Sequence, residues 1–192
     1  MKKLTYVVMI AAAGMVFQAC HSNTDSTSAA DSANAVKDTT TNGSTGIGVV
    51  ADDAKFAVDA ANGGMTEVEL SKLAAAKAIN ADVKAFANMM ITDHGKANEE
   101  LKGIAATKNI TLPDSVNADS KSAIEDLSNK SGADFDKAYV DKMVSDHKST
   151  VDMFESASKN LKDPDLKAFV DKTLPVIKGH LDHINRIQSS MK

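Results

Sequence analysis

From Asp52 to the C-terminus, apolar residues recur at alternating spacings of three and four. This periodicity places them on one face of an α-helix, so each stretch is expected to bury a single apolar stripe against its neighbours. Four such stretches follow one another, and the whole chain has only three Pro, ten Gly and 4% aromatic residues. A chain with few helix breakers and few strand-favouring aromatics is predicted to be all-α.

Turn-forming and capping residues divide this region into separate helices. Asn80-Ala-Asp82 interrupts the pattern after the first stripe, Pro113 follows the second, and Gly132 and Pro164 precede the third and fourth. These signals predict long helices over residues 52–78, 82–108, 132–160 and 163–190, and a short connecting helix over residues 118–129. Four long helices with compact links favour an antiparallel four-helix bundle over residues 51–192.

Each apolar stripe contains one strongly polar residue. These residues are Glu67, His94, His147 and His180. Each lies within about four positions of the midpoint of its helix, and a rise of 1.5 Å per residue then puts all of them within about 6 Å of one level. Burying such groups unpaired costs several kcal/mol, so they must hydrogen-bond one another, trap water or hold a metal ion.

Two roles for this polar layer remain open from the residues alone. One carboxylate and three imidazoles match the ligand preferences of zinc, iron, copper and manganese sites. Buried polar groups can instead fix the register of packed helices without any metal. Asp93 and Asp146 directly precede two of the histidines and are either acceptors for imidazole N–H groups or solvated charges, while His183 is a further outer ligand candidate.

The N-terminal segment predicts export and a lipid anchor. Residues 1–20 contain two lysines, an uncharged stretch from Leu4 to Phe17, and the only cysteine, Cys20. The stretch is too short to span a bilayer, and its order is that of a secretory signal. The segment resembles a bacterial lipoprotein signal with lipidation at Cys20; the alternative is an ordinary signal peptide with an incidental thiol.

A polar segment follows the cysteine. Of the 25 residues from 21 to 45, 17 are Ser, Thr, Asn or Asp, and no apolar face can be drawn through them. Such a composition does not offset the entropy lost on ordering, so residues 21–50 are expected to form a disordered tether.

Charge and motifs exclude several functional classes. The formal net charge is −4, and no clustered basic face is evident, so a nucleic-acid partner is not expected. The chain has no Ser-His-Asp order, no HExxH zinc-protease motif, no EF-hand and no CxxC. Nothing in it therefore predicts an enzyme.

Several motifs together are similar to one known family. They are the run from Phe56 to Ala74 with Gly63-Gly64 and Glu67, Met90-Ile-Thr-Asp93-His94, Leu112-Pro113, Gly132-Ala-Asp-Phe135-Asp136-Lys-Ala-Tyr139, His147, and Leu174-Pro175 with His180. Over about residues 50–187 the chain resembles bacterial envelope proteins with a domain of unknown function, often labelled as outer-membrane proteins. The resemblance implies a ferritin-like fold and the site positions Glu67, Asp93, His94, His147 and His180.

The chain departs from the di-iron pattern of ferritin-like proteins. Those proteins carry Glu-x-x-His on two helices. In this chain the residues three positions before the histidines of the polar layer are not glutamates but Ile91, Val144 and Ile177. A mononuclear or metal-free layer fits this chain better than a di-iron centre.

The prediction for function is a lipid-anchored protein of the bacterial cell envelope that binds a transition metal through the Glu/His layer. The anchor is assigned to the outer membrane rather than the inner one, with the domain in the periplasm or at the surface. The alternative is a non-enzymatic structural or stress-related envelope protein, which binds a partner that the sequence does not identify and keeps a metal-free polar layer.

Overall fold

The computed structural model describes residues 25–38 and 48–191, and all regular secondary structure in these ranges is helical. The helices are α1 (Ser26–Asp38), α2 (Ala51–Lys77), α3 (Ala81–Thr107), α4 (Ala118–Ser128), α5 (Gly132–Asn160) and α6 (Pro164–Ser190). The prediction of an all-α protein is confirmed. The five helices predicted from the sequence agree with α2 to α6 within one residue at each end.

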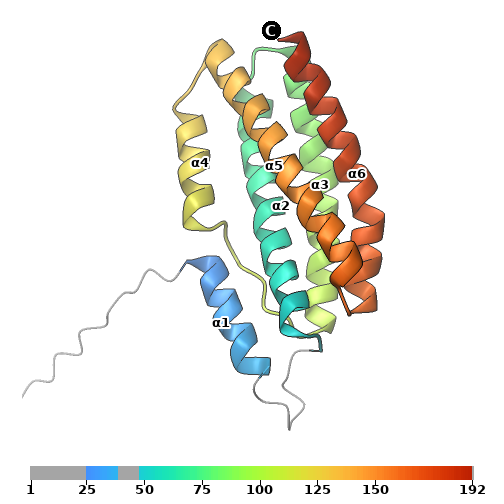
Figure 1. Ribbon diagram of the computed structural model, residues 1–192. Helices are drawn as coiled ribbons and strands as arrows, with labels where there is room; N and C mark the ends of the chain where they lie inside the picture. Colours follow the sequence, from blue (N-terminus) through green and yellow to red (C-terminus); the bar gives the residue numbers. More distant parts are fainter. Residues whose placement is uncertain (1–24, 39–47, 192) are drawn as a thin grey trace, which may run out of the picture.

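The four long helices lie side by side as a helical bundle (Figure 1). Packing is most extensive between α2 and α3 and between α5 and α6, and contacts of α3 with α6 and of α2 with α5 complete the bundle. The short helix α4 packs on α2 and α5. Amphipathic helices of this length bury their apolar stripes only against one another, which is why the four long helices associate.

Two buried aspartates connect the ends of the two helix pairs. Asp136, near the start of α5, accepts hydrogen bonds from the link between α2 and α3, including one of 2.7 Å from the N–H of Asn80. Asp53, near the start of α2, does the same for the link between α5 and α6, with a bond of 2.6 Å from the N–H of Asp163. Each link is therefore held by a carboxylate from the opposite pair.

These contacts reveal an internal repeat of two helix pairs. Asn80 and Asp163 each cap the helix that follows, by accepting hydrogen bonds from backbone N–H groups two and three residues on. Asn80 follows Asp53 by the same number of residues as Asp163 follows Asp136. Each of the two capping residues also precedes a Lys-Ala-Phe sequence, Lys84 to Phe86 or Lys167 to Phe169. Helices α2 and α3 thus correspond to α5 and α6.

Helix α1 corrects the prediction of a disordered tether over residues 21–50. Residues 26–38 are helical and pack on α2. The side chain of Asn34 is buried, accepts from the N–H of Thr111 at 2.7 Å and donates to its carbonyl at 3.0 Å. The composition argument failed here because small residues such as Ala30 allow close packing, and tertiary hydrogen bonds then stabilise a segment with little apolar surface.

The predicted signal segment and Cys20 lie outside the described residues. Among the helices that the structure describes, none is long and apolar enough to cross a membrane.

Two apolar clusters fill the bundle. One contains Phe86, Tyr139 and Met143 and lies toward the link between α2 and α3. The other contains Phe154 and Phe169 and lies toward the link between α5 and α6. Along every long helix the chain passes from one cluster to the other, and the position between them is polar.

Candidate functional site: a histidine layer in the bundle core

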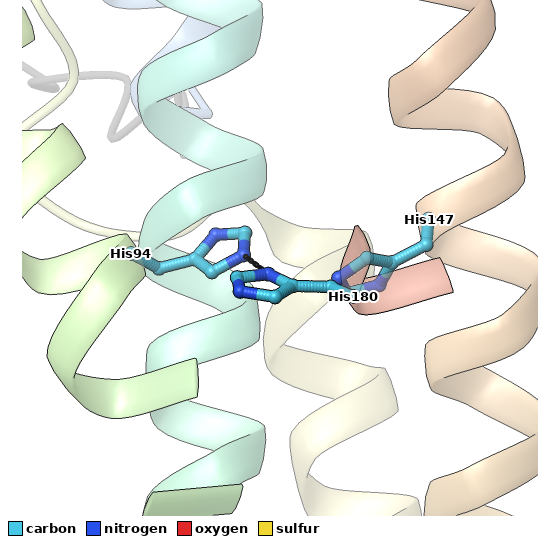
Figure 2. A group of neighbouring side chains, drawn as sticks. All are labelled: His94, His147 and His180. Atoms are coloured by element: carbon cyan, nitrogen blue, oxygen red, sulfur yellow. Dashed lines mark hydrogen bonds between the residues drawn. The ribbon is translucent and has the colours of Figure 1, made fainter. Parts of the chain in front are cut away.

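The polar layer between the clusters takes one side chain from each long helix. Glu67 comes from α2, His94 from α3, His147 from α5 and His180 from α6, and none of them is more than 7% exposed. The three imidazoles converge between the helices (Figure 2). One ring nitrogen from each histidine lies within 4.8 Å of the other two, and this is the spacing of a group that could hold a metal ion.

Glu67 lies beside the Nδ1 atoms of two of the rings. Its Oε2 is 3.0 Å from Nδ1 of His94, and its Oε1 is 3.3 Å from Nδ1 of His147. The Nδ1 atom of His147 also lies 2.9 Å from the carbonyl oxygen of Met143, one helical turn earlier. A carboxylate and a carbonyl only accept hydrogen bonds, so in both rings Nδ1 carries the proton.

The ring of His180 is held through Nε2, whereas the other two rings are held through Nδ1. Nε2 of His180 is 3.1 Å from Oδ2 of Asp93, so His180 donates this N–H to the carboxylate. Its Nδ1 atom lies 3.3 Å from Nε2 of His94. Asp93 is the next residue to His94 in the chain, but it pairs with a histidine on another helix.

If all three rings are neutral, the hydrogen bonds leave one lone pair on each ring without a proton. A neutral imidazole has one N–H, and acceptors hold that N–H in each of the three rings. In that case Nε2 of His94 and Nδ1 of His180, which lie at hydrogen-bond distance (Figure 2), have no hydrogen to share. Within the described part of the chain, Nε2 of His147 and Oε1 of Glu67 are buried without any hydrogen-bond partner.

Burial and the neighbouring charges set the ionisation of the layer. Burial lowers the pKa of His147, and it lowers the pKa of His180 to about 4, so both rings are neutral near pH 7. Burial acts to raise the pKa of Glu67, but the charge interaction and hydrogen bond with His94 outweigh it, and the pKa of this carboxyl lies below its usual range. The layer thus combines a buried carboxylate with two neutral imidazoles, those of His147 and His180.

Two other candidates lie away from the layer. Asp146 pairs with Lys142 at 2.7 Å and contacts no imidazole N–H, and burial raises the pKa of its carboxyl despite that lysine. His183 is half-buried and packs against the ring of Phe86, with centroids 5.4 Å apart. Neither belongs to the group of three converging histidines.

Sequence reasoning missed two contributors. The carbonyl of Met143 orients His147 from the backbone, and a backbone acceptor leaves no signal in residue type. Phe86 packs against the rings of His147 and His180, with centroids 6.2 and 6.3 Å away, and in the sequence it is one apolar stripe residue among many. Such contacts limit how far the rings can turn.

Comparisons with known proteins give a family and a fold. A family model described as Domain of unknown function (DUF4142) matches residues 28–187. A crystal structure of a DUF305 fragment from Deinococcus radiodurans is similar with a TM-score of 0.67 and 9% identity, over 74% of this chain and 98% of that one. At such low identity the likeness is one of fold alone. No curated protein matches this chain.

Proposed function

The chain belongs to the family described as Domain of unknown function (DUF4142), and on that premise we propose that it is a cell-envelope protein that binds one transition-metal ion in its histidine layer. The ligands are Nε2 of His94, Nε2 of His147 and Nδ1 of His180. One observation carries the proposal: the N–H groups of all three rings are engaged by acceptors, while their remaining lone pairs converge.

The spacing of the nitrogens supports this proposal. Two nitrogens bound to one tetrahedral metal at 2.0–2.1 Å are about 3.3–3.4 Å apart. Nε2 of His94 and Nδ1 of His180 are 3.3 Å apart. A separation that is unfavourable for two bare lone pairs is therefore suited to a shared cation.

Charge balance supports it as well. Glu67 and Asp93 lie against the ligand rings on the sides away from the converging lone pairs. Their two negative charges would offset a divalent cation bound to three neutral imidazoles, which reduces the cost of burying it. Such carboxylates also hold each ring in the tautomer that ligates. In this proposal Glu67 therefore orients ligands, whereas the sequence had placed it among the ligands.

The ligand set favours some metals over others. Imidazole nitrogen suits zinc, copper and iron, whereas manganese favours oxygen ligands. With three nitrogen ligands and no oxygen ligand from the protein, we propose zinc or copper, with iron weaker and manganese weakest.

Metal analysis of matched variants tests the proposal. Protein stripped with chelator is dialysed against each of the four metals, and bound metal per chain is measured. We expect one zinc or copper ion per chain, at least tenfold weaker binding in His180→Ala, and parent-like binding in His183→Ala. The two histidines lie three residues apart on α6, so the pair separates ligation from the general loss of an imidazole. Equal behaviour of the two variants, or a parent that binds no metal, would contradict the proposal.

A metal-free layer is the second candidate, because part of the layer is hydrogen-bonded. If His94 were protonated on both nitrogens, it could donate to Glu67 and to His180 at once, at the observed 3.0 and 3.3 Å. The layer would then fix the register of the four helices. This metal-free alternative predicts that His94→Ala lowers the stability of the protein. It also predicts that the melting temperature of the parent does not change when any of the four metals is added.

The envelope location remains a proposal from the sequence. We propose that Cys20 carries acyl chains and anchors the protein to a membrane, the outer rather than the inner one. The sole cysteine after a short apolar stretch supports this. Cys20→Ser should release the protein from the membrane fraction, and a parent whose mature mass shows no lipid would contradict the anchor.

We also propose that the bundle is antiparallel and ferritin-like. The links of three residues between α2 and α3 and between α5 and α6 support a reversal of direction within each pair. The aspartate caps support the same arrangement, because each brings the start of one hairpin to the turn of the other.

A further inference from the structure

A small cavity lies directly beside the histidine layer. It has a volume of about 50 Å³, and it is bounded by residues of α2, α3, α5 and α6. His94 and His180 form part of its wall, and so do Glu67 and Asp93, whereas His147 does not. Most of the remaining wall is apolar. The cavity therefore adjoins one side of the converging nitrogens.

Small residues make room for this cavity. At Gly64 an added Cβ would lie 2.1 Å from the side-chain oxygen of Asn98, so that glycine serves the close packing of α2 and α3. At Gly63, which also lines the cavity, an added Cβ would meet nothing within 4 Å. The cavity reaches the surface near Val176, whose side chain lines it and which is 44% exposed. A small solute can thus enter from solvent.

We propose that this cavity is a binding pocket for a small exogenous ligand of the metal, a neutral or singly negative molecule of two or three non-hydrogen atoms with a nitrogen or oxygen donor. This inference rests on the proposed metal site. Three protein ligands leave one position open in a four-coordinate site. Because His94 and His180, whose ligating nitrogens are 3.3 Å apart, also line the cavity, that position would face it.

The size and charge of the pocket define the ligand class. A cavity needs about 10–15 Å³ of accessible space to hold one water molecule, so about 50 Å³ admits a molecule of a few non-hydrogen atoms. Glu67 and Asp93 already balance a divalent metal, and a dianion would add repulsion from both carboxylates in an apolar surrounding. Dianions such as sulfate are therefore excluded by charge.

Cobalt(II) and azide provide the test. Cobalt(II) replaces zinc in nitrogen-ligand sites, and its visible bands change when a ligand is added or exchanged. The full chain is first titrated with cobalt and then with azide, a singly charged molecule of three atoms. We expect saturable changes in the visible spectrum with azide and none with sulfate.

Two glycine variants locate the binding. Gly63→Leu places a side chain in the cavity without altering any histidine, and it should bind cobalt like the parent but azide at least tenfold more weakly. Gly103→Leu is the matched control, because Gly103 is also helical with nothing within 4 Å of an added Cβ but does not line the cavity. Its azide affinity should equal that of the parent. Gly63→Ala, with a smaller side chain, should give an intermediate loss.

The outcomes separate the two proposals. If cobalt does not bind in the first titration, and zinc and copper do not bind on dialysis, the metal site and the pocket are both overturned. If metal binds but azide changes nothing, or if Gly63→Leu binds azide as the parent does, the ligand pocket is overturned and the metal site stands.

Discussion

Replacement of Glu67 by glutamine tests how the layer holds its imidazoles. The carboxylate presents one oxygen to Nδ1 of His94 at 3.0 Å and the other to Nδ1 of His147 at 3.3 Å. Glutamine keeps nearly the same shape but has one oxygen and one NH₂ group, which only donates. In either orientation of the amide, one Nδ1–H then faces another donor. If that ring is His94, it is driven to the other tautomer and its ligating lone pair is lost. If it is His147, the carbonyl of Met143 still holds the proton on Nδ1, and metal binding is weakened instead by the loss of the negative charge that balances the cation.

The expected loss can be estimated in advance. Removing a carboxylate that orients a metal-bound histidine weakens metal binding roughly 10- to 100-fold, or about 1.4–2.7 kcal/mol. With metal at a hundredfold excess over the parent dissociation constant, metal stabilises the parent by about 2.7 kcal/mol. The same metal concentration should stabilise Glu67→Gln by only about 0.4–1.4 kcal/mol.

Urea unfolding followed by helix circular dichroism, with and without metal, measures this difference. Glu69→Gln is the matched control, because Glu69 lies two residues away on the same helix and pairs with Lys72 at the exposed surface. Its metal-dependent stabilisation should equal that of the parent. The reasoning is refuted if Glu67→Gln keeps the full stabilisation by metal, or if Glu69→Gln loses as much.

Three further predictions concern acid, a cap and a glycine. The pKa of His180 is lowered from 6.5 to about 4 in the folded chain, so on acidification the unfolded chain takes up this proton first. The free energy of unfolding of the metal-free protein should therefore fall as the pH drops below about 6.5, and the contribution of this group should level off below about 4. The total loss, measured by urea titrations across pH, should be at most about 3.4 kcal/mol. Asp136→Ala leaves partly buried N–H groups at the turn near Asn80 without an acceptor and should cost about 1–3 kcal/mol in thermal or urea unfolding. An unchanged midpoint would contradict the role of this carboxylate. Gly63→Ala should stabilise the chain by about 0.5–1 kcal/mol, while Gly64→Ala should gain less or lose stability because its Cβ meets Asn98; equal midpoints for the two would contradict the close approach.

Local sequence determined the helices and the level of the polar layer. Helix ends depend on caps and breakers near in the chain, such as Asn80 and Asp163, and the buried face depends on a repeat of 3.6 residues. Both can be recognised without knowledge of the partner helices. The same periodicity placed Glu67, His94, His147 and His180 on inward faces near the helix midpoints, and the structure brings these four together.

Tertiary structure alone decided which atoms meet. Asp93 and Asp146 each directly precede a histidine of the layer and gave the same signal in sequence, yet Asp93 bonds His180 across the bundle while Asp146 pairs with Lys142 on its own helix. The difference arises from what the neighbouring helix presents at each position, which residue spacing along one helix does not encode.

Contacts between residues far apart in the chain also explain why the sequence did not predict helix α1 or the roles of two buried aspartates. Helix α1 depends on hydrogen bonds between Asn34 and a loop 77 residues further on. The buried aspartates Asp53 and Asp136 accept hydrogen bonds from links more than 50 residues away. Helix formation is local, since its hydrogen bonds span four residues. The pairing of buried polar atoms depends on how separate helices rotate and pack, and only the folded bundle sets that geometry.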